Sequence, residues 1–247
     1  MTGVFISRGM KVVIPPGGFT FGFGGAPESE SGVTLHVHFD VCPTWAELAI
    51  RHLAEANERR KARQKAWAGT DVGAKATTLE REFESSMQAI MASAIAIDAF
   101  YSVVQTLVKI PPETTAKWRS KRTARYAQVA EVLRHAFPMK PKSLSALRAN
   151  LKAIYGLRDL AVHPSGKLEA PLLHPELDVG VEWRFAYFHA AAAEGIVHSA
   201  TWILWTFAHN RQHDDPKISQ YMSTMGLRLK ELFPAGHPLL TKSADPS

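Results

Sequence analysis

The first 41 residues show the two-residue alternation of β-strands. In the segment VTLHVHFD at 33–40, four apolar residues point to one side and four polar or charged residues point to the other. Glycines between residues 17 and 25 separate shorter runs, KVVI and FTFGF. This pattern predicts an antiparallel hairpin or small sheet with one solvated face.

From residue 44 onward, apolar residues recur every three or four positions, which is the period of an amphipathic helix. Thr44 with Glu47, and Thr77 with Glu80, have the spacing of a capping box, which begins a helix. The predicted helices span residues 44–67, 77–109, 115–136, 143–163, 185–209 and 217–232.

These elements predict a mainly α-helical protein, an up-and-down helical bundle with an N-terminal β-hairpin or small-sheet appendage. The small-residue stretch AGTDVGAKATT at 68–78 is typical of a linker and places a boundary after the first helix. The predicted organisation is a β segment plus basic helix at 1–67, a helical bundle at 77–233 and a flexible tail at 234–247.

The helix predicted at 77–109 is almost long and apolar enough to span a membrane. However, Asp98 lies in its middle, and the charged stretch EREFESS at 80–86 lies near its beginning. Ionisable residues are rare inside membranes, so this pattern favours a buried core helix and no membrane association.

Composition is that of an ordinary globular protein, with 46% hydrophobic and 21% charged residues among 247. The net charge of +6 favours polyanionic partners. The single cysteine, Cys42, excludes an internal disulfide, and no Cys/His set has zinc-finger spacing. Because the N-terminal residues lack an apolar stretch of signal-peptide length, the expected compartment is the cytoplasm.

The fourth predicted helix carries a charged residue where its pattern requires an apolar one. Leu151 and Ile154 belong to its buried stripe, and the next position of that stripe is Arg158. A buried guanidinium is costly unless an anion pairs with it. We therefore expect Arg158 to form an ion pair with Asp98 or Asp159.

The end of the same helix carries a short motif. In LRDLAVHPSG, Arg158 is followed by the polar residue Asp159, three further residues and then His163, directly before Pro164. This resembles the Arg-x4–6-His motif of HEPN domains (higher eukaryotes and prokaryotes nucleotide-binding), in which a polar residue follows the arginine.

The segment AIAIDAFYS at 94–102 is similar to the first core helix of that family, and the resemblance covers residues 77–209. Arg184 and His189, in RFAYFH, satisfy the bare spacing as well. That second match lies early in a helix and lacks both the adjacent polar residue and the His-Pro stop, so the first match is preferred.

The resemblance implies an HEPN-like bundle and a metal-independent endoribonuclease, in which a 2′-hydroxyl attacks the adjacent phosphate. His163 would be the general acid or base. Arg158 would hold the phosphoryl oxygens, and Asp159 would orient the imidazole ring. Such an enzyme would suit a toxin or defence effector, with an antitoxin or regulatory protein as its neutralising partner.

The spacing of the motif poses a geometric problem. On an ideal helix, side chains five residues apart point about 140° from one another, so Arg158 and His163 do not converge. A distortion at His163–Pro164 would bring them together. A homodimer in which each copy contributes residues would also do so, and it is the usual assembly in this family.

Aromatic and basic residues alternate in two of the predicted helices, which is typical of an RNA-binding surface. The first stretch lies within 59–67. The second comprises Lys117, Trp118, Arg119, Lys121, Arg122, Arg125 and Tyr126.

Each of these features has an alternative interpretation. Charged helical faces are often only solvated, and an ion pair of Arg158 with Asp98 would also serve to fix helix register. His36, His38 and Asp40 resemble a metal site on one strand face, but exposed alternating polar residues explain them better, so no metal or cofactor is expected. The alternative function is a non-catalytic HEPN-like module that binds RNA, a nucleotide or a protein partner. A third possibility is a purely structural dimer.

Overall fold

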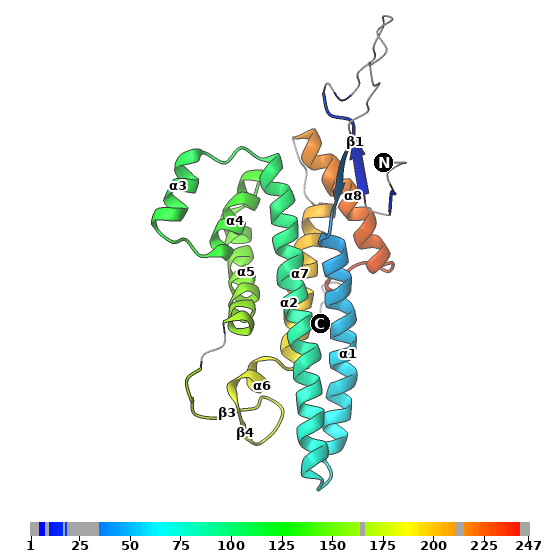
Figure 1. Cartoon of the computed structure of the whole chain (residues 1–247), viewed down its shortest axis with the longest axis vertical. Coiled ribbons are helices and arrows are strands. Elements are labelled where there is room, and N and C mark those ends of the chain that lie inside the picture. Colours follow the sequence, from blue (N-terminus) through cyan, green and yellow to red (C-terminus); the bar gives the residue numbers. More distant parts are fainter. Residues whose placement is uncertain are drawn as a thin grey trace, which may run out of the picture. The chain divides into compact units, whose positions relative to one another are not determined.

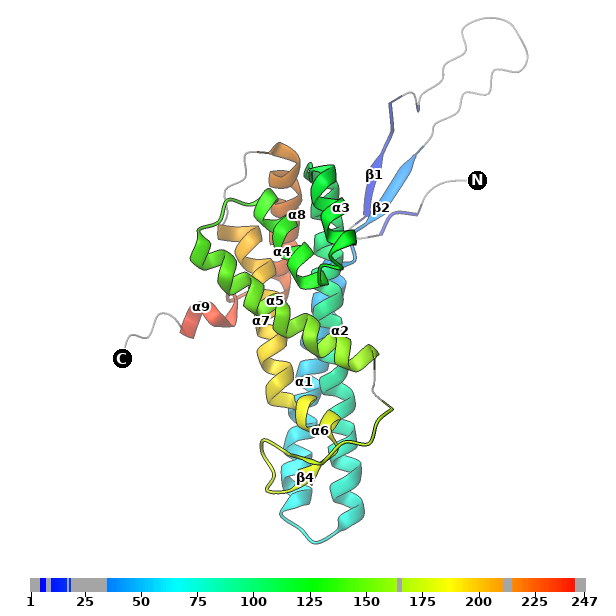
Figure 2. The same cartoon turned by 90° about the vertical axis from the view of Figure 1, so that its left-hand side faces the viewer.

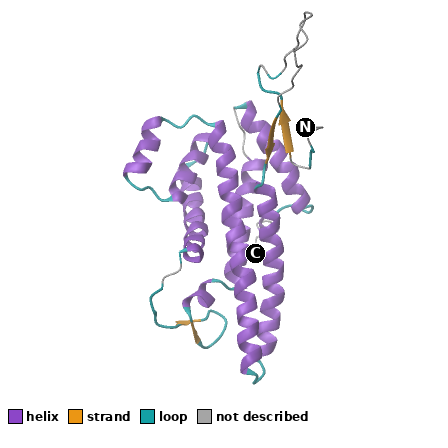
Figure 3. Cartoon of the chain, viewed as in Figure 1, coloured by secondary structure: helices purple, strands orange, loops and turns teal. Residues whose placement is uncertain are grey.

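The computed structural model describes residues 5–7, 10–16, 18, 35–163, 166–210 and 215–242. The chain divides into two compact units, Met1–Val41 and Cys42–Ser247. The second unit is a bundle of helices, and the first contains a small antiparallel sheet (Figure 3). The predicted fold class, a mainly α-helical bundle with an N-terminal β appendage, is confirmed.

In the N-terminal unit, strand β1 (Met10–Val13) pairs antiparallel with β2 (His36–Phe39). The register places Val12 opposite Val37 and Met10 opposite Phe39. The predicted sheet is present, but its apolar face is not covered, since Val37 and Phe39 are each 43% exposed. The apolar side chains of this face therefore pack mainly against their cross-strand partners. The run FTFGF lies outside the described residues.

The helical unit begins with a long antiparallel pair, and further helices pack along that pair (Figures 1 and 2). The helices are α1 (Cys42–Trp67), α2 (Val72–Leu107), α3 (Pro112–Ser120), α4 (Arg125–Ala136), α5 (Pro141–Val162), α6 (Trp183–Tyr187), α7 (Ala190–Asn210), α8 (Pro216–Leu232) and α9 (Pro238–Lys242). A two-stranded ribbon of β3 (Leu172–Leu173) and β4 (Gly180–Val181) lies between α5 and α6.

Helix α2 is the central element of this unit, because α1, α4, α5 and α7 all contact it. Buried alanines on α1, among them Ala46 and Ala49, allow the two long helices to approach closely. On another side, Phe100 of α2 stacks on Phe207 of α7, and Phe137 lies 4.4 Å from Phe207 between ring centroids. In the described part of the chain, α2 alone is long and apolar enough to cross a membrane, and 56% of its most apolar window is buried.

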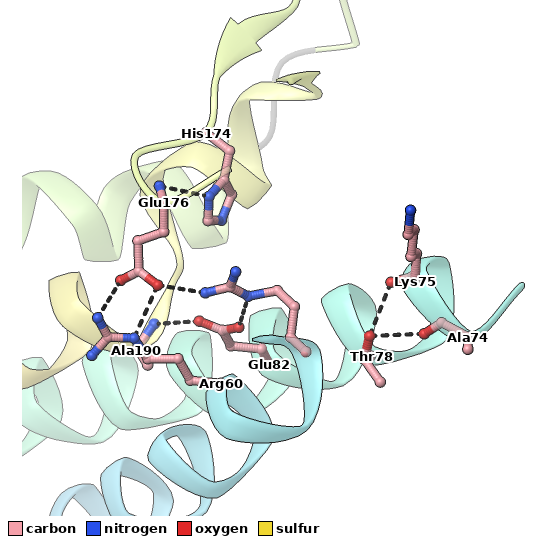
Figure 4. Close-up of polar contacts among 9 residues, drawn as sticks. Arg60, Ala74, Lys75, Thr78, Glu82, His174, Glu176 and Ala190 are labelled. Carbon is pink, nitrogen blue, oxygen red and sulfur yellow. Dashed lines mark hydrogen bonds and ion pairs between the residues drawn. The ribbon is translucent and has the colours of Figure 1, made fainter. Parts of the chain in front are cut away.

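The two long helices begin earlier than predicted. Helix α1 starts at Cys42, so Thr44 lies inside its first turn. Helix α2 starts at Val72, where Asp71 Oδ1 accepts a hydrogen bond from Ala74 N at 3.1 Å. Thr78 lies inside this helix, and its hydroxyl donates to the Ala74 carbonyl (Figure 4). An aspartate cap thus replaces the predicted threonine cap.

These earlier starts change the domain boundary. The connection between the first two long helices shortens from the predicted 68–78 to residues 68–71. Helix α1 packs along most of α2, so the basic helix belongs to the bundle rather than to the N-terminal segment. The division of the chain falls after Val41, instead of after residue 67.

The helix predicted at 115–136 is interrupted, because its middle forms a Schellman turn. The Thr123 N–H donates to the Trp118 carbonyl at 2.9 Å, and the Arg122 N–H donates to the Arg119 carbonyl at 3.3 Å. Arg122 has φ +48°, the left-handed conformation that glycine usually supplies. The sequence has no glycine or proline at this position, and the helical periodicity continues through it. The break could therefore not be predicted from either signal.

Comparing two substitutions at position 122 isolates the backbone conformation, since both remove the same charge. We expect Arg122→Gly to be more stable than Arg122→Ala by about 1 kcal/mol, because only glycine adopts positive φ without steric cost. Urea unfolding of both variants measures the difference. Equal stabilities would contradict the left-handed turn.

The end of the described chain is more ordered than the predicted flexible tail. His237 is fully buried, its Nδ1 accepts from Leu239 N (3.2 Å) and its Nε2 lies 2.9 Å from Thr201 Oγ1. The Thr201 hydroxyl already donates to Val197 O, so it accepts from Nε2–H and the imidazole is neutral. This histidine attaches the segment before α9 to α7. Residues 243–247 lie outside the described part.

Burial, with a smaller effect of His198, lowers the pKa of His237 to about 4. The group is neutral in the folded chain, so its stabilisation is complete above the unfolded pKa of about 6.5 and is lost as the pH falls towards 4. The difference between the unfolded and folded pKa values of His237 corresponds to about 3 kcal/mol of unfolding free energy at most.

We expect His237→Gln to make the decline of stability between pH 6.5 and 4 shallower, as measured by chemical unfolding at a series of pH values. His135→Gln, at a partly exposed histidine on α4, is the control. A wild-type stability that is flat across this range would contradict the assignment.

Candidate functional site

Asp98 of α2 is the centre of a polar cluster that joins three helices. Its Oδ1 accepts hydrogen bonds from Arg125 Nε of α4 and from the Tyr155 hydroxyl of α5, both at 2.8 Å. Its Oδ2 lies 3.8 Å from Arg158 Nη1. The side chain is one-quarter exposed, so the cluster lies at the edge of the core. The aspartate that interrupts the apolar pattern of α2 is therefore fully engaged.

Arg158 has the anionic environment that its position on the stripe requires. Its Nη2 lies 2.9 Å from Asp159 Oδ1, and the guanidinium lies 5.0 Å from the centre of the Tyr155 ring. The expected pairing is confirmed for both aspartates, although Arg125 is the closer partner of Asp98. The Arg158 side chain stays 26% exposed, so solvent or a ligand can reach it.

Two members of this cluster, Arg125 and Tyr155, have a raised pKa. Burial lowers the pKa of Arg125, but the hydrogen bond and the charge of Asp98 outweigh it, so that pKa is raised. Burial and the adjacent Asp98 carboxylate both raise the pKa of Tyr155. Arg125 therefore remains a cation, and Tyr155 remains a phenol that donates its hydrogen.

His163 lies at the other end of the motif, at the C-terminal end of α5. Its backbone N–H donates to the Asp159 carbonyl at 3.0 Å, and the residue is exposed. Its imidazole makes no hydrogen bond or ion pair with any residue that the structure describes. The Asp159 carboxylate pairs with Arg158 instead of orienting the ring. Within the described part of one chain, Arg158 and His163 make no hydrogen bond or ion pair with each other, and Pro164 lies outside that part.

A cavity of about 310 Å³ lies between α2, α3 and α4. Two of the predicted RNA-binding residues, Arg119 and Arg125, line this cavity, and the Arg125 guanidinium lies 4.1 Å from the centre of the Tyr101 ring. The remaining lining residues are Gln105, Thr115, Trp118 and Gln128. The other predicted basic residues, Lys117, Lys121 and Arg122, are exposed nearby on the chain but are not part of the lining. Arg125 therefore connects the cavity to Asp98.

A second polar cluster, which the sequence did not suggest, is buried near the far end of the α1–α2 pair (Figure 4). Arg63 of α1 is 0% exposed and donates through Nε to Glu82 of α2 and through Nη2 to Glu176 at 2.5 Å. Arg60 donates to the same Glu176 at 2.9 Å. The two cations and two carboxylates balance, as buried charges require.

The same cluster holds the loop before α7 in place. Glu82 Oε1 accepts from the backbone N–H of Ala190, the first residue of α7, at 3.0 Å. His174 is buried, and its Nδ1 accepts from the Glu176 N–H at 3.1 Å (Figure 4). Its ring lies 5.7 Å from that of His189. Helices α1, α2 and α7 and the β3–β4 segment therefore meet at one buried set of charges.

Burial lowers the pKa of both His174 and His189, so each is neutral near pH 7. Burial raises the pKa of Glu176, but hydrogen bonds from Arg63 and Arg60 outweigh it, so that pKa is lowered. A cluster of fixed ions and neutral histidines suits structural support better than proton transfer.

In the predicted RNA-binding stretch 59–67, Arg60 and Arg63 belong to this second cluster, whereas Lys61 and Lys65 stay exposed. Arg59 pairs with Glu55, and Lys61 pairs with Glu58. A signal for the buried Arg63 existed, because the apolar stripe of α1 at Ala49, Leu53 and Ala56 continues to residues 60 and 63. The off-pattern reasoning used for Arg158 would have found it.

Among the described residues, no group of three or more His, Cys, Asp or Glu side chains could hold a metal ion. Fold and site together define a helical-bundle protein with a partly exposed arginine–aspartate cluster beside a basic, aromatic cavity. Comparisons with protein-family models, curated proteins and solved structures found no match for this chain.

Removing one partner of the buried cluster tests its contribution to stability. We expect Arg63→Met to lower the unfolding free energy by about 3–5 kcal/mol, because it leaves the Glu82 carboxylate buried without its cation. Arg59→Met is a matched control on the same helix, where an exposed ion pair contributes about 0–1 kcal/mol. Denaturant unfolding measures both, and similar effects of the two would contradict the assignment.

Proposed function

We propose that this chain is a metal-independent endoribonuclease of HEPN type. The observation that carries the proposal is the state of Arg158: two aspartates and Tyr155 orient its guanidinium, yet a quarter of the side chain stays accessible. His163 follows on the same helix, exposed and without a side-chain partner among the described residues. An oriented cation and an available imidazole are the two groups that this chemistry needs.

In the proposed reaction, the ribose 2′-oxygen forms a bond to the adjacent phosphorus while the bond to the 5′-oxygen of the next nucleotide breaks. The 2′-hydroxyl proton goes to a base, and the leaving 5′-oxygen receives a proton from an acid. The products are a 2′,3′-cyclic phosphate and a 5′-hydroxyl end. His163 takes one of the two proton-transfer roles, and Arg158 stabilises the charge that develops on the phosphoryl oxygens.

The separation of Arg158 from His163 favours a site made by two copies of the chain. Leu160 and Val162, on the last turn of α5, are 38% and 44% exposed. These apolar side chains beside His163 suit a contact with a second copy, which would bring one copy's histidine near the other's arginine. A growth-inhibiting toxin or defence effector in the cytoplasm, restrained by a partner protein, is the biological role that we propose.

The alternative is a non-catalytic module that binds RNA or a nucleotide. The cavity favours it, because Arg119 and Trp118 line the cavity independently of His163. In that case Arg158 would serve only to hold α5 against α2. The two functions differ in whether RNA is cut.

We expect the purified full-length chain to cleave mixed RNA in the presence of a chelator. Arg158→Ala and His163→Ala should each lower the cleavage rate by about 10²–10⁴-fold, and the double variant should be little worse, because groups acting as a unit are not additive. Gel analysis with end-group chemistry should show cyclic or 3′-phosphate ends.

Arg148→Ala, on the exposed side of the same helix, and His135→Ala, in the last turn of α4, are the matched controls and should retain activity. Circular dichroism checks that each variant is folded. Activity that chelator abolishes and magnesium restores would reject the mechanism. A folded wild-type chain that cuts no RNA would favour the binding module.

A further inference from the structure

The cavity between α2, α3 and α4 has the chemistry of a binding site for a base and a phosphate. It combines an indole, a phenol ring, two guanidinium groups and two side-chain amides within about 310 Å³. That volume lies at the lower end of the range of about 300–1,000 Å³ that is typical of ligand pockets. A small ligand is therefore indicated, of the size of one nucleotide unit.

The two arginines of the cavity differ in their partners within the protein. Arg125 donates to Asp98 and lies over the Tyr101 ring, so it belongs to the wall. Arg119 is exposed, and its guanidinium makes no hydrogen bond or ion pair with any residue in the described part of the chain. An arginine without a protein anion, at the edge of a cavity, is the group that would receive a phosphate.

The wall also offers partners for an aromatic base. Trp118 is partly buried, packs against the hydrophobic core and lines the cavity. The Gln128 amide donates to the Thr123 carbonyl at 2.7 Å, which fixes its side chain and leaves its own carbonyl oxygen as an acceptor. Stacking on an indole and hydrogen bonding to an amide are the two ways in which proteins commonly hold a base.

The Schellman turn holds these groups in place before any ligand arrives. Trp118 and Arg119 accept the two backbone hydrogen bonds of the turn, and Arg122 adopts the left-handed conformation that closes it. The two backbone hydrogen bonds fix the path of the chain between α3 and α4, which restricts where Trp118 and Arg119 lie. A pre-organised site loses less conformational entropy on binding.

We propose that this cavity is a nucleotide subsite in which the base stacks on Trp118 and the phosphate binds Arg119. The ligand is an aromatic base carrying a phosphate, supplied either as a free nucleotide or as one unit of an RNA strand. The subsite is distinct from the Arg158–His163 pair and does not depend on cleavage. In an RNA ligand, Arg125 and Asp98 would connect it to the neighbouring cluster around Arg158.

Calorimetric titration of the full-length chain with AMP, adenosine, inorganic phosphate and a pentamer of adenylate tests the proposal. We expect saturable AMP binding, at least about tenfold tighter than that of adenosine or phosphate alone, because the site uses both parts of the ligand. A pentamer that binds more tightly than AMP through the same side chains identifies RNA as the source. A pentamer that binds more weakly than AMP identifies the free nucleotide.

Variants separate the two halves of the site. Arg119→Ala, at an exposed position, should weaken AMP to the level of adenosine while leaving adenosine binding unchanged. Trp118→Phe should weaken both ligands and retains an aromatic ring for the core. Arg148→Ala is the matched control, since it removes the same charge from an exposed position on α5 outside the cavity and should have no effect on AMP.

Three results would overturn the proposal: no binding of either AMP or the pentamer, equal affinity for AMP and adenosine in the wild-type chain, or unchanged AMP affinity in folded Arg119→Ala. None of them bears on the Arg158–His163 pair, whose test is RNA cleavage. A chain that binds AMP through Arg119 but cuts no RNA would support the subsite and reject the nuclease.

Discussion

The buried Arg63 guanidinium is the interaction on which the arrangement of the bundle depends most. It lies between two carboxylates, Glu82 on α2 and Glu176 on the β3–β4 segment, and Glu82 also accepts from the first backbone N–H of α7. Buried charges tolerate little displacement, because an unpaired ion in the interior costs several kcal/mol. The cluster therefore determines where α1, the connecting loop and α7 meet, which hydrophobic packing alone specifies less narrowly.

A second carboxylate on α2, Asp98, also pairs with arginines of neighbouring helices. Both carboxylates, Glu82 and Asp98, interrupt a strongly apolar helix. Glu82 binds Arg63 of α1, and Asp98 binds Arg125 of α4 and Arg158 of α5. The two clusters differ in exposure, since Arg63 is fully buried whereas Arg158 is 26% exposed. This difference decides which cation a ligand could reach, because it could compete for the partly exposed Arg158 but not for the buried Arg63.

The cavity and the Asp98 cluster share one residue, Arg125. Arg125 belongs to both, donating to Asp98 on one side and lining the cavity on the other. A ligand bound in the cavity would therefore contact the same arginine that holds α4 against α2. Asp98 also contacts Tyr155 and Arg158 of α5, so the arginine that lines the cavity shares one carboxylate with the helix that precedes His163.

The sequence by itself determined the fold class, the apolar faces and the need of Arg158 for an anion, because periodicity and the cost of burying charge are local or pairwise properties. Residues Leu147, Leu151 and Ile154 are buried as their spacing predicted. The break at Arg122, the earlier helix starts and the assignment of α1 to the bundle came only from the tertiary structure. So did the choice of Arg125 as the main partner of Asp98, and that of Glu82 and Glu176 as the partners of Arg63. These depend on which elements pack together, and the sequence pattern does not encode that choice, since several cations satisfy one carboxylate equally well until the packing brings one of them within reach.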